Sequence, residues 1–224
     1  MSDLAALTEA LRGLLGPGVG VAATDPTAAA GALYPGEDAA VTRAVPRRRL
    51  EFAAGRQAAR LAMADIGLPP APVPQGPDRA PVWPEGLVGS IAHCSTACIA
   101  AVAPRTHLRA IGIDIEDATP LEAELEGTIC TRSERAWLDR QPARDRALLA
   151  KLIFSAKEAV YKARYPLTGE MIGFDAVEIT ASTSTGGFSI AFPGGLARFP
   201  GHAPPDGRWQ IVGNLLVCGL ILPD

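Results

Sequence analysis

The chain has 224 residues, a net charge of −3 and a hydrophobic content of 48%, which is typical of one large or two small globular domains. A charge so near neutrality argues against a general nucleic-acid binder, which is usually basic. The longest apolar run, residues 211–222, is too short to cross a bilayer, and the first residues lack the basic region of a signal peptide. We therefore expect a cytoplasmic protein with neither a membrane nor a nucleic-acid partner.

The four cysteines, at positions 94, 98, 130 and 218, form no CxxC pair, and the three histidines do not cluster in the sequence. This spacing argues against a structural zinc site. Because the chain carries no secretory signature, we expect all four cysteines to be free thiols.

The amino-terminal half predicts helices and short strands joined by segments rich in Gly and Pro. In chain order we expect a helix ending at Gly16, a strand at 19–23, a helix from Pro46 to Ile66, an extended connector at 69–84, and strands at 87–91 and 98–102. The second helix carries Arg49, Arg56 and Arg60 on one face. Charge alone predicts that this face contacts solvent.

The carboxy-terminal half alternates between strands and helices in the same way. We expect a strand at 110–115, an acidic solvated linker at 117–126, a helix through Leu138, a long helix from Pro142, and strands at 176–180, 188–192 and 209–222. The segment Thr131-Arg132-Ser133-Glu134 is a capping box, which marks the start of the shorter helix.

The stretch FSAKEAVYKA, residues 154–163, stands out by its lysines. Of 21 basic residues only Lys151, Lys157 and Lys162 are lysines, and everywhere else the chain uses arginine. A helical arrangement places four side chains on one narrow stripe: Lys151, Ser155, Glu158 and Lys162. The simpler interpretation is a surface Glu158–Lys162 pair, which stabilises a helix by only about 0.2–0.5 kcal/mol. The functional interpretation is a compact, titratable charge that donates a proton or binds a phosphate.

Two shorter motifs precede this helix. In GIDIE, residues 112–116, Asp114 and Glu116 project from the same face of a strand, with Cα atoms about 6.5–7 Å apart. Two neighbouring carboxylates repel each other unless a proton or a cation such as Mg²⁺ lies between them, although a strand that simply ends in acidic residues is a common arrangement. In GSIAHC, residues 89–94, His93 either donates to a phosphate or has a structural role.

Taken together, and in this order, the segments RRRLEFAAGR, APVWPEGLVGSIAHC, GIDIE and FSAKEAVYKA resemble one family, the 4′-phosphopantetheinyl transferases. The length favours the long surfactin/enterobactin-synthetase type, similar to enterobactin synthase component D. The resemblance covers about residues 46–165. It implies a mixed α/β (α+β) fold, a pseudo-dimer of two similar halves at residues 1–106 and 107–224, with coenzyme A in the cleft between them.

The resemblance also implies roles for individual residues. The metal site for Mg²⁺ would be formed by Asp114, Glu116 and Glu158. Coenzyme A would be contacted by basic side chains: Arg48, Arg56, Arg79, His93, Lys157 and Lys162. A lysine that the family often carries before the PxWP segment is missing, and Gln75 or Arg79 stands in its region.

The activity implied by the resemblance is transfer of the 4′-phosphopantetheine arm of coenzyme A to a serine of apo acyl or peptidyl carrier proteins, with release of 3′,5′-ADP. Such a transfer depends mostly on positioning and on neutralising charge. The candidate catalytic residues are Glu158, Glu116 and Lys162. The base is Glu158 or a metal-bound water, and Lys162 is a candidate donor to the departing nucleotide.

Two other functions use the same residues. A Mg²⁺-dependent phosphohydrolase would cleave coenzyme A or a nucleotide without a protein acceptor, and a non-catalytic module would only bind coenzyme A. The carrier-protein partner of a transferase is acidic, and five arginines are candidates for its docking surface: Arg132, Arg135, Arg140, Arg144 and Arg146. Residues 169–174, with Met171 and Phe174, are candidates for the path of the pantetheine arm. We expect a monomer, because the two halves already close the cleft.

Overall fold

The computed structural model describes residues 3–28, 31–195 and 199–224. The helices are α1 (Leu4–Leu15), α2 (Pro46–Asp65), α3 (Ala123–Ile129), α4 (Arg132–Leu138) and α5 (Ala143–Thr168), with short 3-10 turns η1 (Asp38–Val41) and η2 (Phe174–Ala176). The strands are β1 (Gly20–Thr24), β2 (Leu87–His93), β3 (Cys98–Pro104), β4 (Leu108–Asp117), β5 (Glu178–Ala181), β6 (Gly187–Ala191), β7 (Gly207–Val212) and β8 (Leu215–Pro223). None of the helices in these ranges is both long and apolar enough to cross a membrane.

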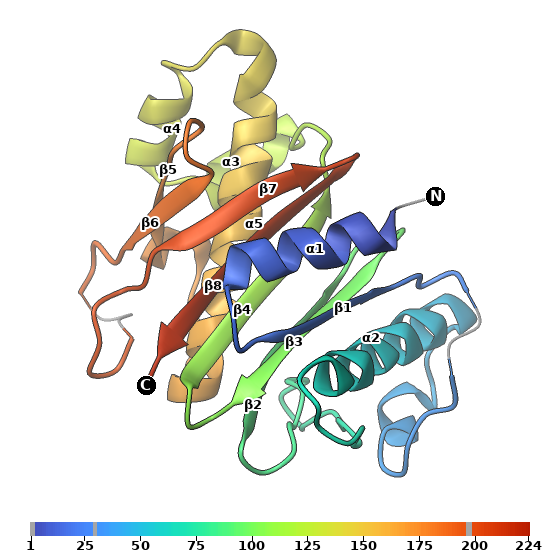
Figure 1. The fold of residues 1–224 in the computed structure, drawn as a ribbon. Helices are drawn as coiled ribbons and strands as arrows, with labels where there is room; N and C mark the ends of the chain where they lie inside the picture. The colour runs from blue at the N-terminus through green and yellow to red at the C-terminus, as the bar shows by residue number, and fades with distance from the viewer. Residues whose placement is uncertain (1–2, 29–30, 196–198) are drawn as a thin grey trace.

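The amino-terminal strands form a three-stranded antiparallel sheet in the order β1-β3-β2, and α2 packs on one of its faces (Figure 1). Alanines 58, 59 and 62 of α2 are fully buried against this sheet. Gly20 makes the close approach possible, because a Cβ atom at this position would lie 2.0 Å from the carbonyl oxygen of Ala62. The basic residues of α2 are therefore held on a fixed frame.

The remaining strands form a five-stranded antiparallel sheet in the order β4-β8-β7-β6-β5, crossed by α5 (Figure 1). Here Gly112 has the role that Gly20 has in the first sheet. A Cβ atom on Gly112 would lie 1.9 Å from the carbonyl oxygen of Ala159, in the middle of α5. This contact sets the polar residues that follow Gly112 on β4 directly against the polar stripe of α5.

The two sheets share a core on the face opposite the long helices. The apolar side of α1, including Leu7 and Leu11, packs there with Ile113 and Ile115 of β4. Side chains alternate along a strand, so Asp114 points to the α5 face. The hydroxyl of Ser90 on β2 accepts a hydrogen bond from the backbone N–H of Ile113 at 3.2 Å, which joins the sheets at β2 and β4.

The mixed α/β fold predicted from the sequence is confirmed, with corrections in the carboxy-terminal half. The expected linker at 117–126 contains the start of α3, which buries Ile129. The expected strand at 209–222 is the hairpin β7–β8, and it turns at Gly213, whose φ of 61° is readily adopted only by glycine. The expected division at residues 106/107 falls in the turn between β3 and β4.

The basic face of α2 was expected to lie in solvent, which is confirmed for Arg49 but is wrong for Arg56 and Arg60. Arg60 is 8% exposed and pairs with Glu37, which is fully buried, at 3.0 Å. The same carboxylate accepts from the backbone N–H groups of Tyr34 and Val73, both at 2.8 Å. This pair ties the loop before α2 and the Pro-rich connector to the helix, so Arg60 is structural.

Candidate active site

Asp114 is the central acidic residue between β4 and α5. Its side chain is nearly buried, and each of its carboxylate oxygens has a partner on α5. Ser155 Oγ donates to Oδ2 at 2.8 Å, and Lys162 Nζ donates to Oδ1 at 2.6 Å. Two members of the predicted stripe therefore meet on the first carboxylate of the GIDIE motif.

Glu116, two residues further along β4, is half-buried and pairs with Lys151 of α5 at 3.3 Å. Burial raises the pKa of Glu116, and the negative charge of Asp114 raises it further, while Lys151 opposes this rise. The raised pKa is the signature expected for two neighbouring carboxylates.

Glu158 differs from the other two carboxylates because it has no hydrogen-bond or ion-pair partner among the described residues. Burial raises the pKa of Glu158 and the charge of Asp114 adds to the rise, while the charge of Lys162 lowers it. The simple Glu158–Lys162 helix pair is not formed, because Lys162 points to Asp114 instead. A half-buried carboxylate without a partner is suited to accept a proton or a cation.

Lys157 has a different environment from the other two lysines. It is 2% exposed, and its ammonium group donates to the carboxylate of Glu134 at 2.7 Å and to the carbonyl oxygens of Ile129 and Phe174 at 2.8 Å. All three donor positions are thus occupied within the protein. The expectation that Lys157 contacts a phosphate is not supported, because the helix turns its ammonium group into the interior.

The opposite wall of the site comes from the amino-terminal half. Arg48 Nη1 lies 2.7 Å from His93 Nε2, which brings the start of α2 to the end of β2. Desolvation lowers the pKa of His93, and the positive charge of Arg48 lowers it further. His93 is therefore neutral at pH 7 and accepts from the arginine.

Arg56 lies one turn from Arg60 on α2, yet its situation is different. It is 6% exposed, its guanidinium lies 4.0 Å from the centre of the Phe52 ring, and its Nε atom has no partner. Burial lowers the pKa of Arg56 to about 10, so the side chain is still charged at neutral pH. An unpaired buried cation is costly, and an anionic ligand would offset that cost.

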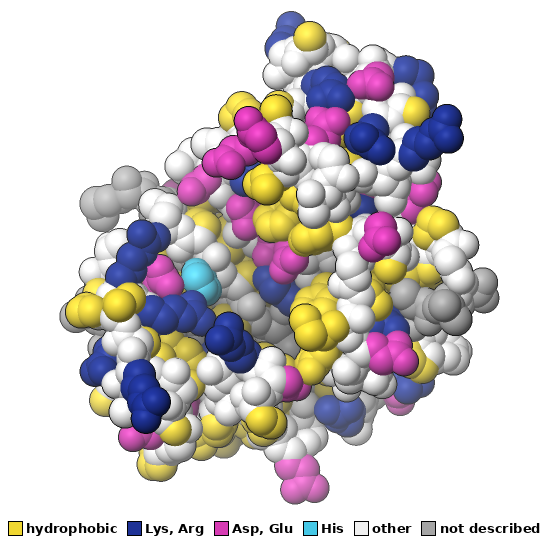
Figure 2. Space-filling view, turned by 180° about the vertical axis from the view of Figure 1, so that it is seen from behind, with side chains coloured by type: hydrophobic (Ala, Val, Ile, Leu, Met, Phe, Trp, Pro, Cys, Tyr) yellow, Lys and Arg dark blue, Asp and Glu magenta, His cyan; other side chains and the backbone are white. Residues whose placement is uncertain are grey.

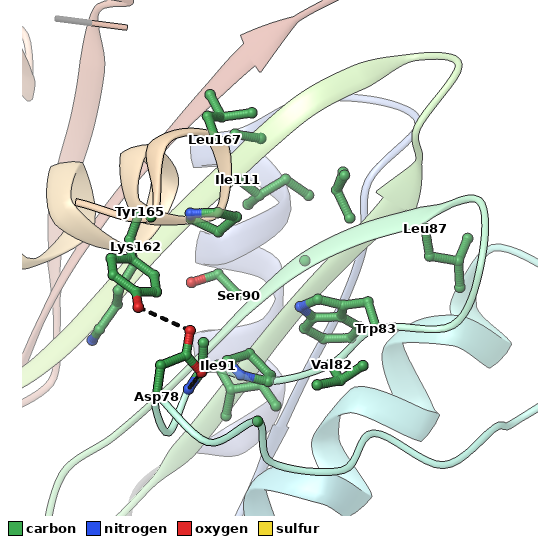
Figure 3. Close-up of a pocket in the computed structure, with 18 of the residues that line it drawn as sticks. Asp78, Val82, Trp83, Leu87, Ser90, Ile91, Ile111, Lys162, Tyr165 and Leu167 are labelled. Carbon is green, nitrogen blue, oxygen red and sulfur yellow. Dashed lines mark hydrogen bonds between the residues drawn. The ribbon is translucent and has the colours of Figure 1, made fainter. Parts of the chain in front are cut away.

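The Pro-rich connector between α2 and β2 folds back on itself beside the site. Gln75 pairs with Pro81 in an isolated bridge, and its side chain donates to the carbonyl oxygen of Arg79 at 3.1 Å. Arg79 itself has a φ of 69°, unusual for a residue with a side chain. Tyr165 of α5 donates to Asp78 of this loop at 2.9 Å, a contact between the halves that is drawn in Figure 3.

Two cavities border the catalytic stripe of α5. The larger, of about 600 Å³, lies between the connector loop, β2 and the end of α5, and includes Arg79, Trp83 and Lys162 (Figure 3). The smaller, of about 240 Å³, includes Glu158 and Met171. Tyr161 lines both. The reverse face of the molecule is hollowed in its middle, with acidic and basic side chains in and around the depression (Figure 2).

The donor set suits a hard divalent cation, since three carboxylates with coupled charges provide the oxygen ligands that Mg²⁺ prefers. Within the described residues, no three His, Cys, Asp or Glu side chains converge closely enough to hold a metal ion. Asp114 and Glu116 each lie against a lysine.

Sequence reasoning placed Asp114, Glu116, Glu158 and Lys162 together, but it assigned no role to Ser155. The helical stripe was the signal that could have found the serine, since Ser155 shares a face with Glu158 and Lys162. No pattern in the sequence indicated the Tyr165–Asp78 hydrogen bond, because it joins positions 87 residues apart.

Comparison with known proteins agrees with this geometry. Residues 36–103 match the 4′-phosphopantetheinyl transferase N-terminal domain, and residues 110–202 match the 4′-phosphopantetheinyl transferase superfamily. The chain is 41% identical over 194 residues to 4′-phosphopantetheinyl transferase Svp of Streptomyces mobaraensis, covering 84% of this chain and 78% of that protein. It is 36% identical over 200 residues to 4′-phosphopantetheinyl transferase Npt of Nocardia iowensis, covering 84% of this chain and 88% of that protein.

Enterobactin synthase component D of Salmonella typhimurium is 37% identical over 141 residues, which cover 62% of this chain and 57% of that protein. The segment that matches the superfamily model, residues 110–202, contains both the β4 carboxylates and the α5 stripe. The chain therefore belongs to the 4′-phosphopantetheinyl transferase superfamily.

Proposed function

We propose that this protein transfers the 4′-phosphopantetheine arm of coenzyme A to a serine of an apo carrier protein. The observation that carries the proposal is the partnerless carboxylate of Glu158 beside the Asp114–Lys162 pair. The two side chains line neighbouring cavities, Lys162 the larger one and Glu158 the smaller one. Phosphoryl transfer needs this kind of positioning and charge neutralisation rather than a protein nucleophile.

Coenzyme A would bind across the two halves. Arg48 and His93 line one side and would contact the nucleotide and its phosphates, and Arg56 would exchange its unpaired buried state for a phosphate partner. Arg79 is exposed, stands on the loop where the family's lysine is missing, and lines the larger cavity. The smaller cavity, between Glu158 and Met171, would accept the start of the pantetheine arm.

In the proposed reaction Glu158 accepts the proton of the carrier serine, and the serine oxygen forms a bond to the β-phosphorus of coenzyme A. The bond from that phosphorus to the bridging oxygen breaks, and 3′,5′-ADP leaves with the electron pair. Lys162, still in contact with Asp114, stabilises the charge on the departing phosphate.

Magnesium is the proposed counter-ion of the pyrophosphate, and when bound it would supply positive charge there. The chain's own contribution would be the three carboxylates, Asp114, Glu116 and Glu158. Lys151, which now neutralises Glu116, would be released by the ion or by the phosphates.

The carrier protein would dock on α4 and the start of α5. Arg132, Arg135, Arg140 and Arg144 are exposed there, whereas Arg146 is engaged with Glu126 and Asp139. An acidic carrier domain fits such a surface. Changing both Arg135 and Arg140 to Glu should raise the KM for the carrier severalfold and leave the KM for coenzyme A unchanged, as measured by initial rates. An unchanged carrier KM would place the docking surface elsewhere.

The activity is tested by intact-mass spectrometry of an apo carrier protein incubated with this protein, coenzyme A and Mg²⁺. The expected result is a mass gain of one phosphopantetheine arm, lost when EDTA is present. Consumption of coenzyme A without a mass gain, across several carrier domains, would instead indicate a phosphohydrolase. Binding without consumption would indicate a coenzyme A-binding module.

A further inference from the structure

Ser155 lies in the interior of α5, one turn before Glu158, and is fully buried. A serine in the middle of a helix commonly bonds to a carbonyl oxygen of its own preceding turn. Here the hydroxyl instead crosses to β4 and donates to Asp114 Oδ2 at 2.8 Å. The serine thus uses its single donor on a charged residue of the site.

The contact completes the environment of the Asp114 carboxylate. Oδ1 accepts from Lys162 at 2.6 Å, so the two oxygens are bonded to side chains that lie seven residues apart on the same stripe of α5. The close approach at Gly112 makes this possible, because it brings β4 within reach of a side chain as short as serine. A carboxylate bonded at both oxygens cannot rotate about its terminal bond without losing a partner.

We propose that Ser155 is a positioning residue, which fixes the Asp114 carboxylate so that its other oxygen is aimed at Lys162 and the cleft. It acts through Asp114 and does not touch substrate. The inference rests on the proposed transferase function, because the consequence of misplacing Asp114 and Lys162 is a slower transfer. Positioning partners of this kind typically contribute about 10–100-fold to activity or metal affinity.

The chain offers an uncommonly clean readout, since it contains only three lysines. Lysine labelled with ¹³C at the ε carbon gives one NMR signal each for Lys151, Lys157 and Lys162. Ser155→Ala should shift the signal of Lys162, which shares Asp114 with the serine, and leave that of Lys157 in place. Lys157 is an internal control because its ammonium group is bonded to Glu134 on another side of the helix.

Activity is measured beside the spectrum, with wild-type protein in the same assay. Ser155→Ala should lower kcat about 10–100-fold and leave the KM for the carrier protein nearly unchanged. The matched control is Thr8→Val, which removes another hydroxyl hydrogen bond, from Thr8 to the carbonyl oxygen of Leu4 in α1, on the sheet face opposite α5. The control should keep wild-type kcat even where it lowers the melting temperature.

A second pair of variants tests whether Ser155 acts through Asp114. In an Asp114→Ala background, adding Ser155→Ala should leave the Lys162 signal where Asp114→Ala alone puts it, because the serine then has no carboxylate to hold. A further shift would overturn action through Asp114. Wild-type kcat and an unmoved Lys162 signal in Ser155→Ala would overturn the positioning role itself. A wild-type protein that transfers no arm would contradict the proposed function instead, and the NMR comparison would still decide the contact.

Discussion

The two long helices, α2 and α5, each carry one basic residue that is locked in a buried ion pair and a second basic residue in a different setting. On α2, Arg60 is locked to the buried Glu37, whereas Arg56 has an Nε atom with no partner. On α5, Lys157 is locked to the buried Glu134, whereas Lys162 meets Asp114 at the open side. Within each helix, one cation is held in a buried ion pair, and the other is the one that we propose contacts a ligand.

Both interior cations also organise loops. Glu37 collects two backbone N–H groups in addition to Arg60, and Lys157 bonds to two backbone carbonyl oxygens in addition to Glu134. A buried pair of this kind adds little net stability compared with apolar residues, but breaking it leaves one charge unpaired. The comparison therefore separates residues that maintain the fold from residues that are free to react.

The largest effect is expected at the reactive side of α5. Glu158→Gln keeps the size of the side chain but removes the proton acceptor, so kcat for carrier modification should fall about 10²–10⁴-fold. Because Glu158 has no partner in the described structure, the variant should unfold at the same denaturant concentration as the wild type. A folded variant with wild-type activity would remove Glu158 from the mechanism.

The next largest effect distinguishes the two buried arginines of α2, Arg56 and Arg60. Arg60→Met should lower the free energy of unfolding by about 3–5 kcal/mol, because it leaves the carboxylate of Glu37 buried without its cation. Arg56→Met should change that free energy little, but should weaken coenzyme A binding about tenfold or more by removing a charged contact. Denaturant titration and calorimetry measure the two quantities. An equal loss of unfolding free energy in both variants would contradict the different roles assigned to Arg60 and Arg56.

The smallest effect concerns the contact between Arg48 and His93. Desolvation and then the charge of Arg48 lower the pKa of His93. Replacing Arg48 by Gln removes the second cause, so the NMR-measured pKa of His93 should rise. An unchanged or lower pKa would show that the two side chains do not interact in solution.

The positions of the motifs were predicted from the sequence more accurately than the contacts that their side chains make. Alternation placed Asp114 and Glu116 on one face of a strand, and the helical period placed Glu158 and Lys162 on one stripe of a helix, because such patterns are local. Only the family resemblance implied that the two elements meet. The patterns did not indicate which way the ammonium group of Lys157 turns, since its partners lie 17 to 28 residues away. The hairpin turn at Gly213 was missed because Trp209–Leu222 is apolar almost throughout, which conceals the reversal.

The role of Gly112 is a further feature that the sequence did not predict. Gly112 was identified only as the first residue of GIDIE. A glycine is needed there for a steric reason, because the carbonyl oxygen of Ala159 occupies the space that a Cβ atom would fill. Such a contact depends on two elements meeting in three dimensions. It is therefore not visible in either segment alone.

The central claim, that the two lysines five residues apart on α5 have separate roles, is tested by comparing Lys157→Met with Lys162→Met. The measurement is the initial rate of carrier modification at a temperature where denaturant curves show both variants folded. We expect Lys162→Met to lose about 10²-fold or more in rate with a modest change in stability, and Lys157→Met to stay within about tenfold of the wild-type rate while losing about 3–5 kcal/mol of stability. The opposite result, a stable but inactive Lys157→Met and a fully active Lys162→Met, would contradict the account.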